Sequence, residues 1–497
     1  MTLLSRISGF GRDVVLSHLF GATAAADAFF VAFRIPNFFR RLFAEGAFAQ
    51  AFVPVLANYN AGPQAALRRF AQVMVGNLAL IVALVTLFGV VGAPLLVSVF
   101  APGFRAAGEQ FELTTELVRI TFPYLLFISL TSFAGAILNS KGRFAVPAFT
   151  PVLLNFCLIG AALVVAPLFA NPVFGLAWGV FAAGLAQLLF QFPALRRLEL
   201  LARPKLDFAD PGAAQVGRLL LPAILAASAS QINTLIDTML ASTLITGSIS
   251  WLYYADRLLE LPVGLVAVAL GTVLLPNLSR LHAANDSTAF ASTLDWGLRM
   301  AIVLGLPAAA ALYVLALPLV SAIFLHGKLA AIDAQMSALA LQAFAAGLLG
   351  ILVVKVLAPG YFARKDTRTP LNFAFVAVGL NVVLNLSLYK ILGHVGLALA
   401  TSAAALANGA LLLRGLARAG VYSPGAAVGK TLLQCLGGAV AMTGVLLALS
   451  PEQSFWLGAS VFDRWLWVAS LCCSGALTYA CVALLLGLRP ASLRHSA

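Results

Sequence analysis

Residues 72–101 read QVMVGNLALIVALVTLFGVVGAPLLVSVFA, a run without one charged side chain. A helix needs about 20 apolar residues to cross the hydrocarbon core of a bilayer. No water is available in that core to satisfy an irregular backbone, so a run of this length predicts a membrane-spanning helix. This stretch decides the fold class, and the rest of the chain repeats its pattern.

Outward from this stretch, thirteen further apolar runs are bounded by charged, proline or glycine residues. We therefore expect an all-α integral membrane protein with about fourteen transmembrane helices. The predicted helices are 3–20, 24–56, 72–101, 113–139, 147–168, 173–193, 217–243, 250–279, 296–324, 334–362, 370–391, 395–415, 428–449 and 464–487.

The composition excludes a soluble globular protein. Of 497 residues, 61% are hydrophobic and 10% are charged, against about half and a quarter in soluble domains.

The five cysteines all lie in apolar runs without metal-ligand spacing, so neither a disulfide framework nor a zinc site is expected. Arg6, Arg12 and Asp13 interrupt what would be the apolar core of a signal peptide, so we expect the first helix to be retained.

The net charge of +13 reflects topology rather than nucleic-acid binding, because Lys and Arg are retained on the cytoplasmic side of a membrane. Connections after even-numbered helices, together with the C-terminus, carry 17 basic residues. Those after odd-numbered helices carry four: Arg105, Lys328, Lys390 and Arg464. Both termini are therefore predicted to be cytoplasmic.

The second part of the chain repeats the first at a nearly constant offset. Gly175-Leu176-Ala177 matches Gly396-Leu397-Ala398, and Pro54 and Pro147 match Pro276 and Pro370. Six helices in each half give both halves the same orientation, which defines a parallel repeat of the kind found in transporters. The predicted division is a six-helix lobe at 1–205, a second at 206–420, and two extra helices at 421–497.

Ionisable residues inside the membrane are costly and mark functional sites by default. They cluster in the first two helices: Arg6, Arg12 and Asp13 in the first, and Asp27, Arg34, Arg40, Arg41 and Glu45 in the second. Arginine binds phosphate bidentately and stays charged when desolvated, so a phosphate or pyrophosphate group suits this cluster. The alternative is that the terminal members lie at the membrane interface and extend their charges to water. Pro36 frees a backbone carbonyl, which is tolerated only where protein or a wet cavity meets it.

The second half carries two further polar groups. Asp256, Arg257 and Glu260 lie in helix 250–279, where Arg257 either adds a cation to the same cleft or forms an internal charge cluster. Asp237, with Asn381, Asn385 and Thr401, offers carboxylate, amide and hydroxyl oxygens, the ligands of hard cations, so a Na⁺ or H⁺ site is one interpretation. Hydrogen bonding between helices is the other.

No HExxH, GxSxG or P-loop pattern occurs, and the five histidines are scattered, so we expect a transporter rather than an enzyme. Three stretches resemble the MurJ (MviN) family of bacterial lipid II flippases, within the multidrug/oligosaccharidyl-lipid/polysaccharide exporter superfamily. They are SRISGFGRDVVLSHLFGATAAADAFFVAFRIPNFFRRLFAEGAFAQAFVPVL at 5–56, WLYYADRLLELPVG at 251–264 and VKVLAPGYFARKDTRTP at 354–370.

The resemblance implies that lipid II, the undecaprenyl-pyrophosphate-linked peptidoglycan precursor, is moved from the cytoplasmic to the periplasmic leaflet of the bacterial inner membrane by alternating access. It implies no cofactor beyond a coupling ion, and as partners membrane lipids and proteins of cell-wall synthesis and division. The last two helices would form a groove for the lipid tail. A related polysaccharide-lipid or drug exporter shares the fold but not the dense arginines, and a division scaffold has no use for buried arginines.

The resemblance also assigns residues. Arg6, Arg12, Arg40 and Arg257 would line a cationic cavity, with Asp13 and Glu45 as associated acids. Independently of the resemblance, we expect gating or structural charges at Asp27, Arg34, Arg41, Asp256 and Glu260. The family's Na⁺ site would fall on Asp237, Asn381, Asn385, Leu397 through its carbonyl, and Thr401.

Overall fold

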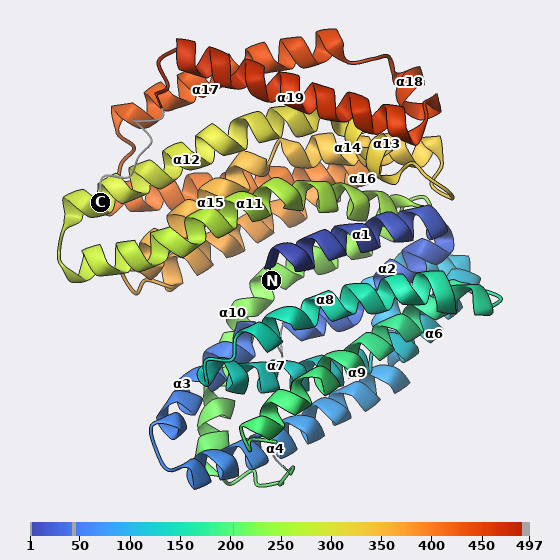
Figure 1. Ribbon diagram of the computed structural model, residues 1–497, viewed down its shortest axis with the longest axis vertical. Coiled ribbons are helices and arrows are strands. Elements are labelled where there is room, and N and C mark those ends of the chain that lie inside the picture. The colour runs from blue at the N-terminus through green and yellow to red at the C-terminus, as the bar shows by residue number, and fades with distance from the viewer. Residues whose placement is uncertain (1, 42–45, 202, 490–497) are drawn as a thin grey trace. The chain divides into compact units, whose positions relative to one another are not determined.

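The computed structural model describes residues 2–41, 46–201 and 203–489, and every regular element among them is helical (Figure 1). Eight of these helices are long and apolar enough to cross a membrane, and a bent pair adds a ninth. Among the remaining predicted spans, 24–56 corresponds to two shorter helices, whereas 3–20, 217–243 and 250–279 each correspond to one continuous helix. The fourteen predicted helices all have a counterpart, so the expected all-α membrane architecture is confirmed.

The chain divides into two compact units, residues 1–250 and 251–497. The helices of the first unit are α1 (Thr2–Phe20), α2 (Ala24–Arg40), α3 (Gly46–Asn60), α4 (Gln64–Val91), α5 (Ala93–Phe100), α6 (Glu109–Thr121), α7 (Tyr124–Ser140), α8 (Ala145–Gly160), α9 (Val173–Arg197) and α10 (Pro211–Ala241). Short helical turns at Pro102–Ala107, Ala161–Val165 and Ala166–Leu168 complete it.

The helices of the second unit are α11 (Ser248–Ala283), which begins at the boundary, α12 (Ser287–Val314), α13 (Ala316–Phe324), α14 (Ala331–Ala345), α15 (Leu348–Phe362), α16 (Arg368–Arg418), α17 (Ala426–Leu449), α18 (Gln453–Gly458) and α19 (Val461–Leu485). α16 joins two predicted spans across a kink at Gly393, whose φ of 58° favours glycine. The sequence assigns α10 to the second lobe, yet α10 packs on α3, α4 and α5. The division at 205 and 420 rests on the repeat rather than on packing and stays a prediction.

Helix breaks recur in the two units at matching places of the sequence repeat. The third predicted span is interrupted at Gly92, and its counterpart, the ninth, is interrupted at Leu315. The fourth span breaks after Thr121, and its counterpart, the tenth, breaks after Ala345 with a bend of 41°. The two halves therefore share their irregularities as well as their helix order.

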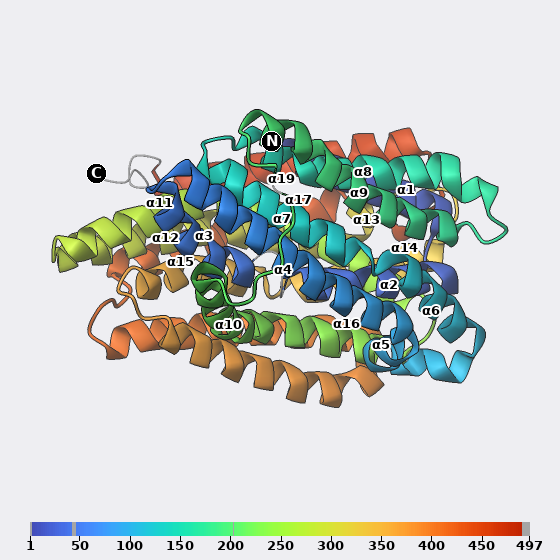
Figure 2. The ribbon, with the colours of Figure 1, turned by 90° about the horizontal axis from the view of Figure 1, so that it is seen from below.

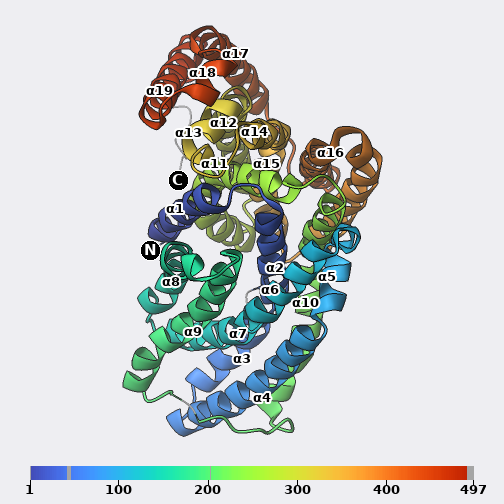
Figure 3. The same ribbon diagram turned by 90° about the vertical axis from the view of Figure 1, so that its right-hand side faces the viewer.

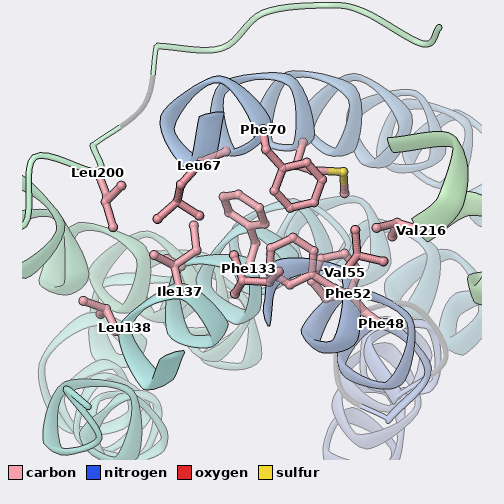
Figure 4. Close-up of a cluster of buried hydrophobic side chains, with 14 of the residues drawn as sticks. Phe48, Phe52, Val55, Leu67, Phe70, Phe133, Ile137, Leu138, Leu200 and Val216 are labelled. Carbon is pink, nitrogen blue, oxygen red and sulfur yellow. The ribbon is translucent and has the colours of Figure 1, made fainter. Parts of the chain in front are cut away.

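Aromatic packing fixes α3 within the first unit. Phe52 stacks on Phe48 at a ring distance of 5.0 Å and lies 5.2 Å from Phe133 of α7 and 5.8 Å from Phe70 of α4 (Figure 4). These rings are almost completely buried. Because the cluster joins three helices, it holds α3 in a defined position beside α4 and α7.

The connection between α9 and α10 packs closely against α4 and is hydrogen-bonded to it. The N–H of Lys205 donates to the Gln72 carbonyl, and a Cβ at Gly76 would lie 2.2 Å from the Lys205 oxygen, so only glycine fits there. Asn77 exchanges hydrogen bonds with the backbone of Asp207 in both directions. These contacts between the connection and α4 fix the direction in which the chain enters α10 (Figure 2).

The two terminal helices, α17 and α19, lie side by side within the second unit and pack on its helices α12 and α13 (Figure 3). The buried Arg464 of α19 donates to the carbonyls of Leu325, after α13, and Leu457, in α18, at 2.8 and 3.1 Å. In the connection that leads to α17, the Tyr422 hydroxyl donates to Asp295 of α12 at 2.7 Å. Burial, and then the Asp295 carboxylate, raise the pKa of Tyr422, so it remains a donor at all ordinary pH values.

Candidate functional site

A buried charge pair lies in the middle of α1. Arg12 is 6% exposed and Asp13 1%, and the Arg12 Nε and Nη2 atoms lie 2.9 and 2.7 Å from one oxygen of Asp13. Arg12 Nη1 donates to the Asn155 side-chain oxygen of α8 at 3.2 Å. The guanidinium is therefore held from two helices inside a membrane-spanning unit.

The other arginine of α1 has a different environment. Arg6 is exposed and lies near the start of the helix. Arg12 and Asp13, in contrast, are buried among α1 and α8. The structure thus separates two arginines that the sequence groups together.

The proline of α2 behaves as the sequence predicts. Pro36 has no N–H, so the Ala32 carbonyl one turn earlier loses its helical donor. The Thr121 hydroxyl of α6 donates to that carbonyl at 3.0 Å. Pro36 is itself buried, so this part of α2 faces protein.

The arginines of α2 have distinct partners. Arg34 donates to the Thr238 hydroxyl of α10 at 2.7 Å, and Arg40 donates through Nε to Asn37 at 3.0 Å. Arg41 is exposed. Glu45, a predicted partner of these cations, falls outside the described residues.

Asp27 is buried at the start of α2 and accepts hydrogen bonds from the beginning of α11. Its two oxygens accept from the Gly247 and Ser250 N–H groups at 2.7 and 2.9 Å, and from the Ser250 hydroxyl at 2.5 Å. These donors belong to the first turn of α11 and the residue before it, where a carboxylate also faces the positive end of the helix dipole. Asp27 thereby ties α2 to the beginning of α11.

A cavity of 590 Å³ opens inside the first unit among α2, α3, α7, α8 and α9. Among the described residues that line it, Arg40 is charged and the other polar members are neutral. Hydrogen bonds join the helices around the cavity. The amides of Gln187 and Gln191 in α9 donate to the carbonyls of Thr150 in α8 and Thr131 in α7, respectively. The neutral polar lining includes Thr131, Ser132, Asn139, Ser140, Thr150, Gln187 and Gln191.

In the second unit, Arg257 of α11 forms an ion pair with Glu260 at 2.7 Å, one turn later. Its guanidinium carbon also lies 4.8 Å from the Tyr253 ring centre. Asp256 is half-buried beside it. The Arg257–Glu260 pair of the internal charge cluster considered from the sequence is therefore present, and a role toward substrate stays a prediction.

The candidate ion-site residues of α16 form a hydrogen-bonded chain. Asn385 donates to the Asn381 oxygen at 2.8 Å, and Asn381 donates to the Thr401 hydroxyl at 3.3 Å across the kink. Leu397 is buried in the same helix. Asp237 belongs to the first unit, where it is half-buried in α10 next to Thr238. Of the five predicted ligands, the structure brings together the three polar ones of α16.

Comparison with solved structures defines the class. The fold matches an inward-facing multidrug-resistance MATE transporter of the MOP superfamily with a TM-score of 0.69 at 16% identity, covering 86% of this chain and 96% of that one. A structure titled "Lipid II flippase MurJ, inward closed conformation" matches with a TM-score of 0.81 at 26% identity, covering 97% of both chains. The protein thus has the fold of this class of membrane transporters.

The sequence comparisons narrow the class to one family. The model of the family described as "Lipid II flippase MurJ" matches residues 16–464. The probable lipid II flippase MurJ of Vibrio cholerae is 46% identical, over 99% of this chain and 96% of that protein. Its Haemophilus influenzae counterpart is 44% identical over 98% of both chains. The chain belongs to the MurJ family.

Proposed function

We propose that this protein flips lipid II from the cytoplasmic to the periplasmic leaflet of the bacterial inner membrane by alternating access. Relatives named probable lipid II flippases match it at 44–46% identity over nearly the whole chain. Flipping is transport and requires no bond to be made or broken, so the protein acts as a transporter and not as an enzyme.

The observation that carries the proposal is the buried guanidinium of Arg12. A cation in a membrane helix is expensive and is retained where it has a function. The guanidinium is planar and presents N–H groups in a fixed fork that matches phosphate oxygens. A pyrophosphate that leaves the head-group region would regain hydrogen bonds there, with Arg6, Arg40 and Arg257 as further cations of the transport path.

The cavity beside Arg40 supports the same function. Its 590 Å³ falls within the usual range of ligand sites, about 300–1,000 Å³. Neutral hydroxyl and amide groups line part of it, beside apolar side chains, which suits the sugar and peptide portion of a lipid-linked precursor. Arg40 at its wall would attract the anionic groups of the same molecule.

Three finer features belong to this proposal. The distribution of basic residues supports cytoplasmic N- and C-termini. Proteins of cell-wall synthesis and division are the expected partners, because they supply and consume lipid II. Na⁺ or H⁺ is the proposed coupling ion, with Asp237 and the Asn381, Asn385, Leu397 and Thr401 group as its site.

The experiment is substitution of Arg12 and Arg40 by alanine, with transport of lipid II measured between leaflets. We expect both variants to insert and to lose flipping, because the pyrophosphate would lose charge-assisted partners. Lysine at either position should restore part of the activity, since it keeps the charge but lacks the fork. Full activity in both alanine variants would contradict the proposal.

A further inference from the structure

Asn155 lies on α8, 5% exposed, between the backbone of α1 and the Arg12 guanidinium. Its amide nitrogen donates to the Ser5 carbonyl at 3.1 Å and to the Ser8 hydroxyl at 2.9 Å. Its oxygen accepts from Arg12 Nη1 at 3.2 Å. We propose that Asn155 is a positioning residue that orients Arg12 toward the pyrophosphate, an inference that rests on the function proposed above.

The contacts fix which way the amide points. A backbone carbonyl can only accept a hydrogen bond, so the Asn155 nitrogen must face Ser5. The side-chain oxygen is then turned toward Arg12. The fit is close, because a Cβ added at Gly9 of α1 would lie 3.4 Å from the Asn155 nitrogen.

Arg12 is consequently held from two sides. Asp13 accepts from Nε and Nη2, and Asn155 accepts from Nη1. Three points on a planar group determine the direction of its plane. A long arginine side chain that is already oriented loses less conformational freedom when it binds a ligand.

Asn155 is uncharged, and this affects how well the site can accept an anion. Asp13 already places one carboxylate against Arg12, and the pair has no net charge. An aspartate at 155 would keep the size and the acceptor, but it would add a negative charge to a site for an anion and could not donate to the Ser5 carbonyl. Asparagine orients the cation without that repulsion.

The test is equilibrium binding of undecaprenyl pyrophosphate to the purified full-length protein. Asn155→Leu removes the hydrogen bonds at similar size, and we expect roughly tenfold weaker binding, the usual scale for losing a hydrogen bond to a charged group. Asn155→Asp should also bind more weakly. Asn77→Leu is the matched control, because Asn77 is equally buried at 5% and bonds the Asp207 backbone instead.

A double-mutant cycle with Arg12→Ala separates positioning from general stability. If Asn155 acts through Arg12, Asn155→Leu has no further effect once Arg12 is alanine. Additive losses, wild-type binding by Asn155→Leu, or equal weakening by Asn77→Leu would overturn the positioning role while leaving Arg12 as a ligand. If the Arg12→Ala single variant binds undecaprenyl pyrophosphate as tightly as the wild type, both the proposed use of Arg12 and this inference are rejected.

Discussion

Asp27 of α2 accepts two hydrogen bonds from Ser250 of α11, one from the N–H at 2.9 Å and one from the hydroxyl at 2.5 Å. A third, from the Gly247 N–H, leaves the carboxylate fully engaged and 2% exposed. The sequence marks Asp27 as a gating or structural charge in a membrane helix but does not indicate its partners. The structure shows it joining two segments that lie far apart in the chain.

This arrangement predicts graded effects of substitution. Asp27→Asn keeps the shape but loses the charge and one acceptor, so we expect destabilisation by about 2–3 kcal/mol, typical of charged hydrogen bonds. Ser250→Ala removes the bond from the hydroxyl alone and should cost less, about 1.5 kcal/mol, the lower end of the range for hydrogen bonds to charged groups. Thermal unfolding of the purified variants measures both, and an equal or reversed order would contradict the assignment.

Filling the cavity should block transport without unfolding the protein. Ser132 is half-buried in the cavity wall, so Ser132→Phe places a ring where the head group is expected. We expect at least tenfold slower lipid II flipping at normal protein levels. Ser470→Phe, on the exposed face of α19, is the control; normal flipping by Ser132→Phe would show that the substrate does not use this cavity.

Arg464 should hold the terminal helices in place. Its guanidinium donates to carbonyls at the ends of α13 and α18, where the last carbonyls of a helix have no partner within the helix. Arg464→Leu is predicted to cost about 3 kcal/mol and to expose the connection before α19 to proteases. Arg418→Leu, at an exposed arginine, should leave the cleavage pattern unchanged. Identical patterns for both variants would refute the role of Arg464.

The candidate ion site is tested by its carboxylate. If Asp237 helps to bind a cation, Asp237→Asn should abolish the dependence of transport on Na⁺ or membrane potential and leave lipid II binding nearly intact. If the residues only join helices, an amide should serve as well as the acid. Identical Na⁺ dependence in the wild type and the variant would end this hypothesis.

Much of the fold could be predicted because apolar runs of membrane length have few alternative structures. The kink at Gly393 falls between two predicted spans, and the carbonyl freed by Pro36 is indeed satisfied by protein. The partner of that carbonyl, Thr121, could not be predicted, because the sequence does not reveal which helices are neighbours. The packing of α10 on α3 escaped prediction for the same reason.

The candidate site was only partly predictable. Buried charges such as Arg12 and Asp13 stand out from an apolar background, whereas Asn155 is one neutral polar residue among many in membrane helices. Its importance depends on lying opposite Arg12 and Ser5, which are distant in the chain. Neutral residues that orient a charge become visible only with three-dimensional contacts.

The most direct test of the central claim is leaflet-resolved labelling of lipid II in cells depleted of this protein. We predict that lipid II accumulates in the cytoplasmic leaflet and that the wild-type chain, but not Arg12→Ala, restores its appearance in the periplasmic leaflet. Undiminished labelling in the periplasmic leaflet after depletion would contradict the account.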